Sequence, residues 1–324
     1  MAALADPSPR PLEIRELRHL SARELEPLLL EETVEWDQEL DWDFSKSAEL
    51  VRKFADMRAL GGAALMDRGE VVGYGYSVLE DEKGLIGDVY VRPGWRRHDA
   101  EIRLFRLMLD GLIAVPQVRR IESQLMLVEP EVAKGLQRER FVRLFERVLM
   151  RYDFAAKFPP TRSRHLSRFR IEPWGEQFHE AASNVMAYSY HGHLDSQIND
   201  QYRTFDGAYK FLQNIVIYPG CGEFCRNGSL VATDLDTGWV SGVILTSFVS
   251  PEVAHITQLC VSPGVHGLGL GYELLRQAAD ALHAEGAARI SLTVTSANTG
   301  ALEMYRNCGF YELRRFFAYV WERY

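Results

Sequence analysis

Hydrophobic residues recur along the chain with two different periods, and each period predicts one kind of regular structure. Alternation of apolar and polar positions is typical of a strand with one buried face, and a spacing of about 3.6 residues is typical of an amphipathic helix. The helical spacing is clear over 272–283, where Leu274, Leu275, Ala278 and Leu282 fall on one side. Both patterns recur throughout, so we expect an α/β fold of mixed, mostly antiparallel sheets flanked by helices.

The predicted elements form two series in the same order. In the first half, strands are predicted at 11–18, 63–66, 71–79, 84–91, 120–128 and 145–151, and helices at 24–39, 48–59, 100–113 and shortly after Val128. In the second half, strands are predicted at 168–172, 230–234, 239–248, 255–261 and 289–295, and helices at 176–190, 207–213 and 272–283.

An internal repeat explains the recurring order. A shift of 170 residues aligns Val-Tyr-Val-Arg-Pro-Gly-Trp-Arg (89–96) with Leu-Cys-Val-Ser-Pro-Gly-Val-His (259–266), and a shift of 169 aligns Phe141 with Phe310. We therefore predict a tandem duplication with a first domain at 1–157 and a second at 168–324. The polar, proline-containing stretch between them, 158–167, is predicted to be a linker.

The stretch 261–271 is the strongest functional signal, because Gly267, Gly269 and Gly271 follow a predicted strand and open a predicted helix. Glycines let a ligand approach the backbone, and the first N–H groups of a helix attract anions, so a bound pyrophosphate is expected here. A dinucleotide fold is excluded because the third glycine comes one residue early and the strand 289–295 ends without a carboxylate. A nucleoside-triphosphate loop is excluded because no Gly-Lys-Ser/Thr follows.

The stretch resembles the coenzyme A loop of the GNAT superfamily of acyltransferases, whose motif is Arg/Gln-x-x-Gly-x-Gly/Ala after Val-x-Pro. His266 stands where that family usually has Arg or Gln. A second GNAT signature follows downstream in the correct order. The matching residues are Val261, Pro263, Gly269 and Gly271 in the loop, and Asn298, Ala301, Tyr305, Gly309 and Phe310 after it.

The resemblance implies an acetyl-coenzyme A site in the second copy. Its strand before the loop would splay from a neighbour and free backbone groups for the pantetheine arm and the thioester. The implied cofactor-binding residues are Leu259, Cys260, Val261, His266, Gly267, Leu268, Gly269, Leu270, Gly271, Asn298, Ala301 and Tyr305. The hydroxyl of Tyr305 would protonate or stabilise the departing thiolate; the alternative for Tyr305 is a packing role on an amphipathic helix.

His255 is the candidate general base. Alternation along 255–261 predicts that His255, Thr257 and Leu259 share one face of the strand that leads into the loop. A histidine with an ordinary pKa can accept a proton at neutral pH directly or through a water. A structural histidine at the start of a strand is the alternative.

The acceptor site is expected in the loop after the first helix of the second copy. Tyr188, His191, His193 and Asp195 are the candidate substrate-binding residues, with a solvated loop as the alternative. Trp36 and Trp42, with the acidic residues between them, occupy the corresponding region of the first copy. No metal is expected, because the pair Cys221 and Cys225 supplies too few ligands.

The first copy lacks the features that bind the cofactor. In the alignment, Arg97, Asp99 and Glu101 replace the three glycines, and Glu129 and Leu136 replace Asn298 and Tyr305. Side chains and negative charges at these positions oppose a pyrophosphate. We therefore predict that the first copy keeps the fold without binding acyl-coenzyme A in the usual mode.

Composition agrees with a globular enzyme. The 324 residues carry a formal net charge of -8, which argues against a nucleic-acid partner. The sequence lacks a long apolar run and a secretion signal, and it has few cysteines, so a cytoplasmic protein without membrane insertion is expected. The sequence carries no signal for the oligomeric state.

Two functions follow from these residues. The first is an N-acetyltransferase that moves an acetyl group from acetyl-coenzyme A to a small-molecule or protein amine in a ternary complex. The second is a non-catalytic acyl-coenzyme A sensor or interaction protein, which would bind the cofactor without transfer. The tandem arrangement with one intact copy is similar to that of the mycothiol synthase family, although a shared architecture does not define the acceptor.

Overall fold

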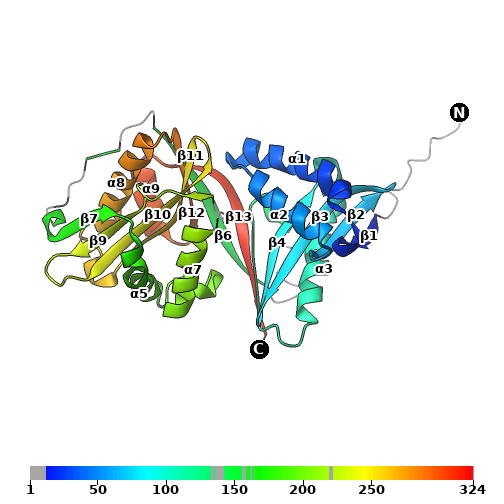
Figure 1. Cartoon of the computed structure of the whole chain (residues 1–324), viewed down its shortest axis with the longest axis horizontal. Helices are drawn as coiled ribbons and strands as arrows, with labels where there is room; N and C mark the ends of the chain where they lie inside the picture. The colour runs from blue at the N-terminus through cyan, green and yellow to red at the C-terminus, as the bar shows by residue number, and fades with distance from the viewer. Residues whose placement is uncertain are drawn as a thin grey trace, which may run out of the picture. The chain divides into compact units, whose positions relative to one another are not determined.

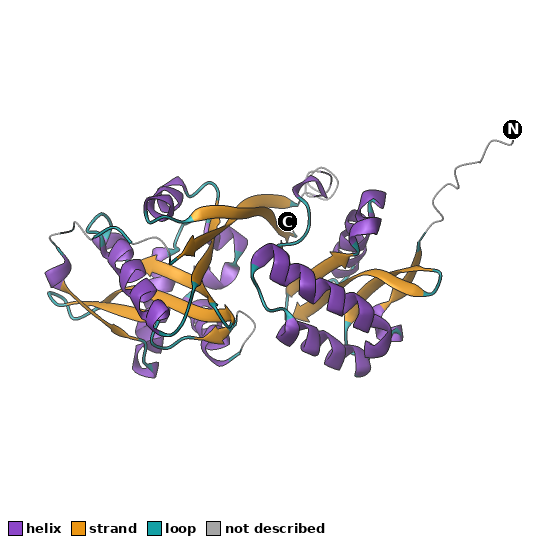
Figure 2. Cartoon of the chain, turned by 90° about the horizontal axis from the view of Figure 1, so that it is seen from above, coloured by secondary structure: helices purple, strands orange, loops and turns teal. Residues whose placement is uncertain are grey.

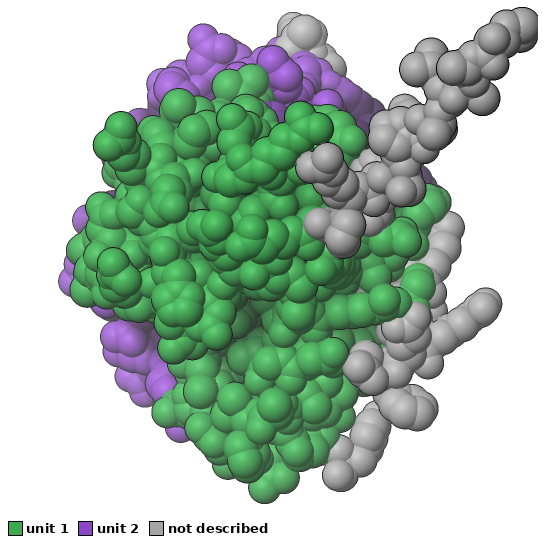
Figure 3. Space-filling model, turned by 90° about the vertical axis from the view of Figure 1, so that its right-hand side faces the viewer, with its two compact units in different colours: residues 1–34, 47–143, 321–324 green, residues 35–46, 144–320 purple. Residues whose placement is uncertain are grey.

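The computed structural model describes residues 12–132, 135, 142–154, 158–160, 163, 165–218 and 222–323. They form two compact units. Unit 1 comprises 1–34, 47–143 and 321–324, and unit 2 comprises 35–46 and 144–320 (Figure 3). Most of the predicted short helix after Val128, as well as Leu136, Phe141 and Cys221, lies outside the described residues.

Unit 1 contains a sheet in the order β1-β2-β3-β4-β5. Its strands are β1 (Glu13–Glu16), β2 (Gly61–Asp67), β3 (Glu70–Glu80), β4 (Lys83–Val91) and β5 (Arg120–Leu125), and its helices are α1 (Ala22–Leu40), α2 (Ser45–Asp56) and α3 (Ala100–Ile113). The first four strands pair antiparallel, whereas β4 and β5 pair in parallel (Figure 1).

Helices cover both faces of this sheet. Tyr74 and Gly75 are neighbours in β3 and therefore point to opposite faces, and each of them meets a helix. On one face, the hydroxyl of Tyr74 donates a hydrogen bond to Glu32 of α1 at 2.8 Å. On the other face, α3 packs so closely that a Cβ at Gly75 would lie 2.4 Å from the Cε of Met108. The helices and strands of unit 1 are distinguished in Figure 2.

Unit 2 contains a sheet in the order β13-β6-β12-β11-β10-β9-β7. Its strands are β6 (Arg143–Asp153), β7 (Phe169–Pro173), β8 (Glu223–Phe224), β9 (Leu230–Asp234), β10 (Val240–Ser250), β11 (Val253–Val261), β12 (Arg289–Thr295) and β13 (Tyr311–Glu322). Its helices are α5 (His179–Ser189), α6 (Asp195–Ile198), α7 (Phe205–Ile217), α8 (Leu270–Ala284) and α9 (Thr299–Asn307). The strand β8 pairs with β10 outside this order.

Two hydrophobic clusters fix the faces of this sheet. Leu274 and Leu275 of α8 pack with Ile244 and Ile256 on one face, which we call the α8 face. The helices α5 and α7 pack with Val243, Leu245 and Cys260 on the other, which we call the α5 face (Figure 1). This architecture confirms the predicted mixed α/β fold.

The strand β6 belongs to unit 2 although it comes from the first half of the chain. It pairs antiparallel with β12 from Arg147 opposite Thr295 to Asp153 opposite Arg289. The boundaries of the two compact units therefore differ from the boundaries of the two sequence repeats. From the repeat we predict a first domain at 1–157, a linker at 158–167 and a second domain at 168–324. These boundaries stay a prediction.

The segment 35–46 also packs in unit 2. The N–H of Asp43 donates to the carbonyl of Val249 at 2.8 Å, and Asp41 forms ion pairs with Arg151 and Arg289. As a result, the end of α1 and the following loop lie beside the start of β11.

The two copies share irregular features as well as regular elements. In β10 and β11 a bulge leaves Thr257 without a partner, because Gln258 pairs with Leu245 and Ile256 pairs with Thr246. In β3 and β4 the same bulge occurs at Gly87, which is the residue that aligns with Thr257. Bulges at equivalent positions support the duplication inferred from the sequence.

Candidate active site

The glycine-rich loop ends at the start of α8 with a left-handed turn. Gly269 is the N-cap residue, with φ 79° and ψ 8°, and Gly267 has φ 76°. A Cβ at Gly269 would also lie 2.8 Å from the Cβ of Ser163. The backbone conformation therefore favours glycine at position 269, and the space around it leaves no room for a Cβ.

Several N–H groups of this loop are available to an anion. Glu273 N–H donates to the carbonyl of Gly269 at 3.0 Å, but within the described part of the chain the N–H groups of Gly267, Gly269, Leu270 and Gly271 have no acceptor. A Cβ at Gly267 would meet no described atom within 4 Å, so the backbone there is open to a ligand. These residues fit a pyrophosphate at the positive end of the helix dipole.

The exposed side chain of His266 supports the loop. Its Nε2 lies 2.9 Å from the carbonyl oxygen of Val261, so the ring bonds to the end of β11. In the first copy, Arg96 makes the same contact through Nε to the carbonyl of Val91, also at 2.9 Å. The residue at this position therefore supports the turn in both copies.

The strand β11 separates from β12 just before the loop. The parallel ladder joins Val253–Ile256 to Arg289–Leu292 and then stops, although β12 continues to Thr295. From Gln258 to Val261, β11 pairs only with β10 among the described strands. Backbone groups of this part of β11 on the β12 side are thus available to a ligand, in the place where the family resemblance implies them.

The bulge at Thr257 changes which side chains of β11 share a face. Leu259 packs on the α8 face with Ala254 and Ile256. His255 therefore points to the α5 face, which it shares with Cys260. The prediction that His255 and Leu259 share one face is wrong, because the bulge reverses the alternation between them.

His255 is buried at the doubly paired end of β11. Its side chain is 8% exposed, its Nδ1 lies 2.8 Å from Ser291 Oγ, and its ring centroid lies 5.0 Å from that of Trp42. Burial, with a smaller effect of the positive charge of Arg147, lowers the pKa of His255 to about 4. The imidazole is consequently neutral at pH 7.

Tyr305 lies on α9, and its helix is capped by Asn298. The Asn298 side chain accepts a hydrogen bond from Ala301 N–H at 3.2 Å, which explains the spacing of these two residues. Burial raises the pKa of Tyr305, the charge of Asp195 adds to this, and Arg147 opposes it. Tyr305 therefore stays protonated and can act as a hydrogen-bond donor.

The predicted acceptor loop divides into an exposed part and a part that joins the site. Tyr188 is 62% exposed, and His191 is exposed as well. By contrast, His193 Nε2 lies 3.5 Å from Asn298 Nδ2, and His193 Nδ1 accepts a hydrogen bond from Asp195 N–H at 3.1 Å. Only His193 and Asp195 are brought to the cofactor signature.

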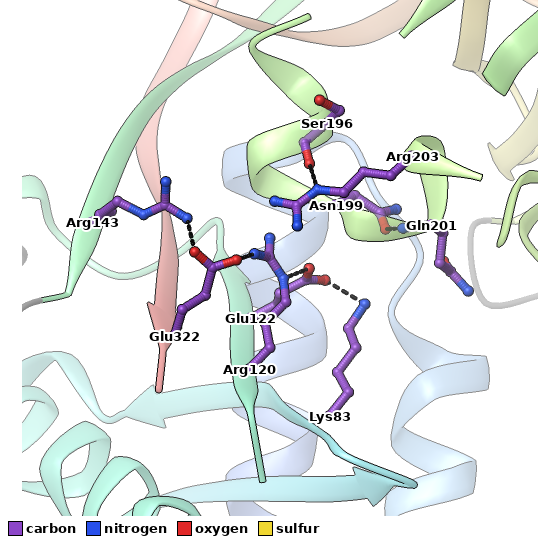
Figure 4. A network of polar contacts seen from close by, with 9 residues as sticks. All are labelled: Lys83, Arg120, Glu122, Arg143, Ser196, Asn199, Gln201, Arg203 and Glu322. Carbon is purple, nitrogen blue, oxygen red and sulfur yellow. Dashed lines mark hydrogen bonds and ion pairs between the residues drawn. The ribbon is translucent and has the colours of Figure 1, made fainter. Parts of the chain in front are cut away.

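Further contacts hold this loop. Asp195 Oδ1 accepts hydrogen bonds from Thr295 Oγ1 at 2.5 Å and from Arg147 Nη1 at 3.2 Å. Arg203 Nε donates to the carbonyl of Ser196 at 2.8 Å (Figure 4). The loop is thereby attached to β12 and β6 rather than freely solvated.

Sequence reasoning missed Arg147 and the position of Trp42. Arg147 lies on β6, in a strand assigned by sequence order to the first copy, and its Nη1 also donates to Thr295 Oγ1 at 3.0 Å. No local motif marks either residue. Only the pairing of β6 with β12 and the packing of 35–46 bring them to the site.

The first copy has ion pairs at the equivalent places. Asp99 adopts the left-handed turn of Gly269, and the buried carboxylate of Glu101 lies 3.6 Å from Arg96. Unit 1 has Glu122 at the place of Ser291 and Leu85 at the place of His255. Glu122 pairs with Lys83 and Arg120, and Glu322 pairs with Arg120 and Arg143 (Figure 4). That this copy does not bind acyl-coenzyme A in the usual mode stays a prediction.

Two kinds of feature are absent from the described residues. No group of three or more His, Cys, Asp or Glu side chains in the described ranges is arranged to hold a metal ion. Among the helices that the structure describes, none is both long and apolar enough to cross a membrane.

The chain consists of two related repeats, and part of unit 2 matches a family of known proteins. Residues 199–310 match the Acetyltransferase (GNAT) family, which uses acyl-coenzyme A as cosubstrate, and the tandem GNAT architecture expected from the sequence is confirmed. The chain is 34% identical over 90 residues to a streptothricin acetyltransferase of Streptomyces lavendulae; the aligned region covers 28% of this chain and 47% of that relative. The chain thus spans about half the length of this curated relative.

Solved structures with the same fold cover nearly the whole chain. A GCN5-related N-acetyltransferase from Sphaerobacter thermophilus has a TM-score of 0.67 at 16% identity, over 97% of this chain and 96% of that one. A tandem GNAT protein from the clavulanic acid biosynthesis pathway has a TM-score of 0.58 at 16% identity, over 96% and 98%. At these identities the likeness concerns the fold.

Proposed function

We propose that unit 2 is an acetyl-coenzyme A dependent N-acetyltransferase that acts on an amine by direct transfer in a ternary complex. Three features carry this proposal: the separated end of β11, the open N–H groups of Gly267, Gly269, Leu270 and Gly271, and the position of Tyr305 on the helix that Asn298 caps. A small-molecule or protein amine is the kind of acceptor that GNAT acetyltransferases use. The predicted cytoplasmic location stays a prediction.

In the proposed transfer, a bond forms between the acceptor nitrogen and the acetyl carbon while the carbon–sulfur bond breaks. The nitrogen loses a proton to a base or to water, and the departing sulfur receives a hydrogen bond or a proton from Tyr305. Because burial raises the pKa of this phenol, stabilisation by a hydrogen bond is favoured over full transfer. Acyl groups longer than acetyl would use the same binding features.

The geometry favours the structural alternative for His255. The ring lies beneath Trp42 and contacts Ser291, and a pKa of about 4 makes it a weak base. His193 is the more exposed histidine of the site, with about a third of its side chain accessible, and it lies beside Asn298. Comparing variants of the two histidines tests which of them takes part in proton transfer.

The experiment for the function is thiol release from acetyl-coenzyme A by the full chain with a panel of amines. Amine-dependent release supports the transferase. Cofactor binding without release for any amine would instead support the sensor, and absence of binding would contradict both. Tyr305→Phe serves as the internal control, because it should bind the cofactor and lose most of the turnover.

A further inference from the structure

The α5 face of unit 2 carries a group of polar side chains that the proposed transfer does not use. Arg147 lies on β6, Ser247 on β10 and Gln258 on β11. Their neighbours Val148, Phe248 and Leu259 all pack on the α8 face, so these three side chains point to the opposite side. That is also the side on which His255 lies.

Each of the three has a buried polar atom without a hydrogen-bond partner among the described residues. The atoms are Arg147 Nε, Ser247 Oγ and Gln258 Nε2. Ser247 is fully buried and Gln258 is 6% exposed. Native proteins rarely leave buried polar groups unpaired, and all three atoms carry hydrogens that they can donate. A ligand that presents oxygen acceptors would satisfy them.

The guanidinium of Arg147 is only partly used. Its Nη1 donates to Asp195 Oδ1 at 3.2 Å and to Thr295 Oγ1 at 3.0 Å, and these contacts fix the orientation of the group. The Nε side has no partner within the described residues. The positive charge of Arg147 adds to the lowering of the His255 pKa that burial causes, and it opposes the rise of the Tyr305 pKa. A planar guanidinium with a free Nε side is suited to a carboxylate.

An aromatic group borders the same face. Trp42 lies 5.0 Å from the His255 ring, and Trp36 contacts Trp42 edge-on at 6.0 Å and stacks on Phe44 at 5.0 Å. The backbone contact of Asp43 to Val249 and the ion pairs of Asp41 hold this segment in place. The aromatic rings can pack against the carbon skeleton of a ligand.

We infer that the acceptor of unit 2 is an amine that also carries a carboxylate, which the Nε side of Arg147 and the Gln258 amide bind while Trp42 packs against its apolar part. This inference rests on the proposed transferase function. It assigns substrate recognition to two segments, β6 and 35–46, that precede the second copy in the sequence. Amines of the same length without a carboxylate are consequently poor acceptors.

The test compares acceptors that differ only in the carboxylate. The full chain is assayed for thiol release with tyrosine, its primary amide and tyramine, and with 4-aminobutyrate and butylamine. We expect kcat/KM at least about tenfold higher for the best carboxylate-bearing amine than for its counterpart, mainly through KM. Equal rates for an amino acid, its amide and its decarboxylated amine would overturn the inference while leaving the transferase function intact. No release with any amine would instead contradict the transferase function.

Variants separate recognition from a purely structural role. Arg147→Met should reduce the preference for the carboxylate to near unity, because kcat/KM should fall much further for the carboxylate-bearing amine than for its counterpart without a carboxylate, and Arg147→Lys should give an intermediate preference. Gln258→Leu should reduce the preference several-fold. Arg170→Met is the matched control, because Arg170 is an exposed arginine that pairs with Glu172 on β7. If Arg147→Met and Arg147→Lys lowered both activities equally, Arg147 would act by holding Asp195, and the inference would fail.

Discussion

Asp99 and Gly269 occupy the same left-handed turn in the two copies of the repeat, with φ 55° for Asp99 and φ 79° for Gly269. Each is the N-cap residue of the helix that follows, α3 in unit 1 and α8 in unit 2. The left-handed turn at the start of the helix has thus been kept in both copies, whereas its residue differs. At this turn the first copy has a negatively charged side chain, whereas the second copy has none.

Substituting each residue by its counterpart in the other copy should change the free energy of unfolding by different amounts. Asp99→Gly removes a side chain from a left-handed turn and should change the free energy of unfolding by less than about 1 kcal/mol. Gly269→Asp should lower it by at least about 1 kcal/mol, because the new Cβ would lie 2.8 Å from Ser163 Cβ. Urea unfolding of the two variants and the parent measures both values. Equal effects would show that the space at Gly269 does not constrain the turn.

Tyr305→Phe should separate chemistry from binding. Loss of the hydroxyl removes one donor to the leaving sulfur, and we expect kcat to fall about 10- to 1,000-fold. The affinity for acetyl-coenzyme A should stay within about twofold, because the ring keeps its packing against Phe310, 5.7 Å away. Steady-state thiol release and calorimetry give the two quantities. Unchanged kcat would remove Tyr305 from the mechanism.

His255 should make stability depend on pH. Its pKa is about 4 in the folded protein and about 6.5 when unfolded, so the unfolded chain binds the proton first as the pH falls. This linkage has no effect above pH 6.5 and destabilises the fold progressively between about pH 6.5 and 4, by about 3 kcal/mol in total.

The measurement is urea unfolding at pH 7.5 and 5.0 of the parent and of His255→Gln, which cannot be protonated. The parent should lose more stability than the variant at pH 5.0. If His255 has the structural role, the pH dependence of thiol release should be unchanged in His255→Gln and altered in His193→Gln. The reverse pattern would restore His255 as the base.

Asp88 should have the opposite effect on stability in unit 1. Burial raises the pKa of Asp88 above its ordinary value, so the protonated acid is favoured in the fold. Its contribution is present below pH 3.8 and is lost as the pH rises through the raised pKa. Asp88→Asn keeps an oxygen that can accept from Val89 N–H, 2.8 Å from Asp88 Oδ1, and should raise the free energy of unfolding at pH 8. A lower stability of this variant at pH 8 would contradict the account.

Much of the fold follows from local pattern. The helix predicted at 100–113 and the strands predicted at 230–234 and 289–295 have the observed bounds, because their apolar periods are clear and turns flank them. The strand predicted at 11–18 is shorter, Glu13–Glu16, since Leu17–His19 forms a turn of 3-10 helix. The tandem arrangement could be predicted because the loop sequence 89–96 recurs at 259–266.

The remaining features depend on contacts between distant residues. A bulge at Thr257 leaves no mark in the alternation of His255 to Val261, so the face of Leu259 was assigned incorrectly. The pairing of β6 with β12 joins residues 136 to 148 positions apart, and no local pattern shows that it brings Arg147 to Asp195 and Thr295. Cutting the chain after β6 would accordingly remove a strand from unit 2.

The most direct measurement of the central claim is calorimetric titration of the intact chain with acetyl-coenzyme A, repeated with Gly269→Asp and Asp99→Gly. The account predicts one binding site in the parent, its loss in Gly269→Asp and its retention in Asp99→Gly, with each variant shown to be folded by circular dichroism. Two sites in the parent, no binding by the parent, or undiminished binding by folded Gly269→Asp would contradict it.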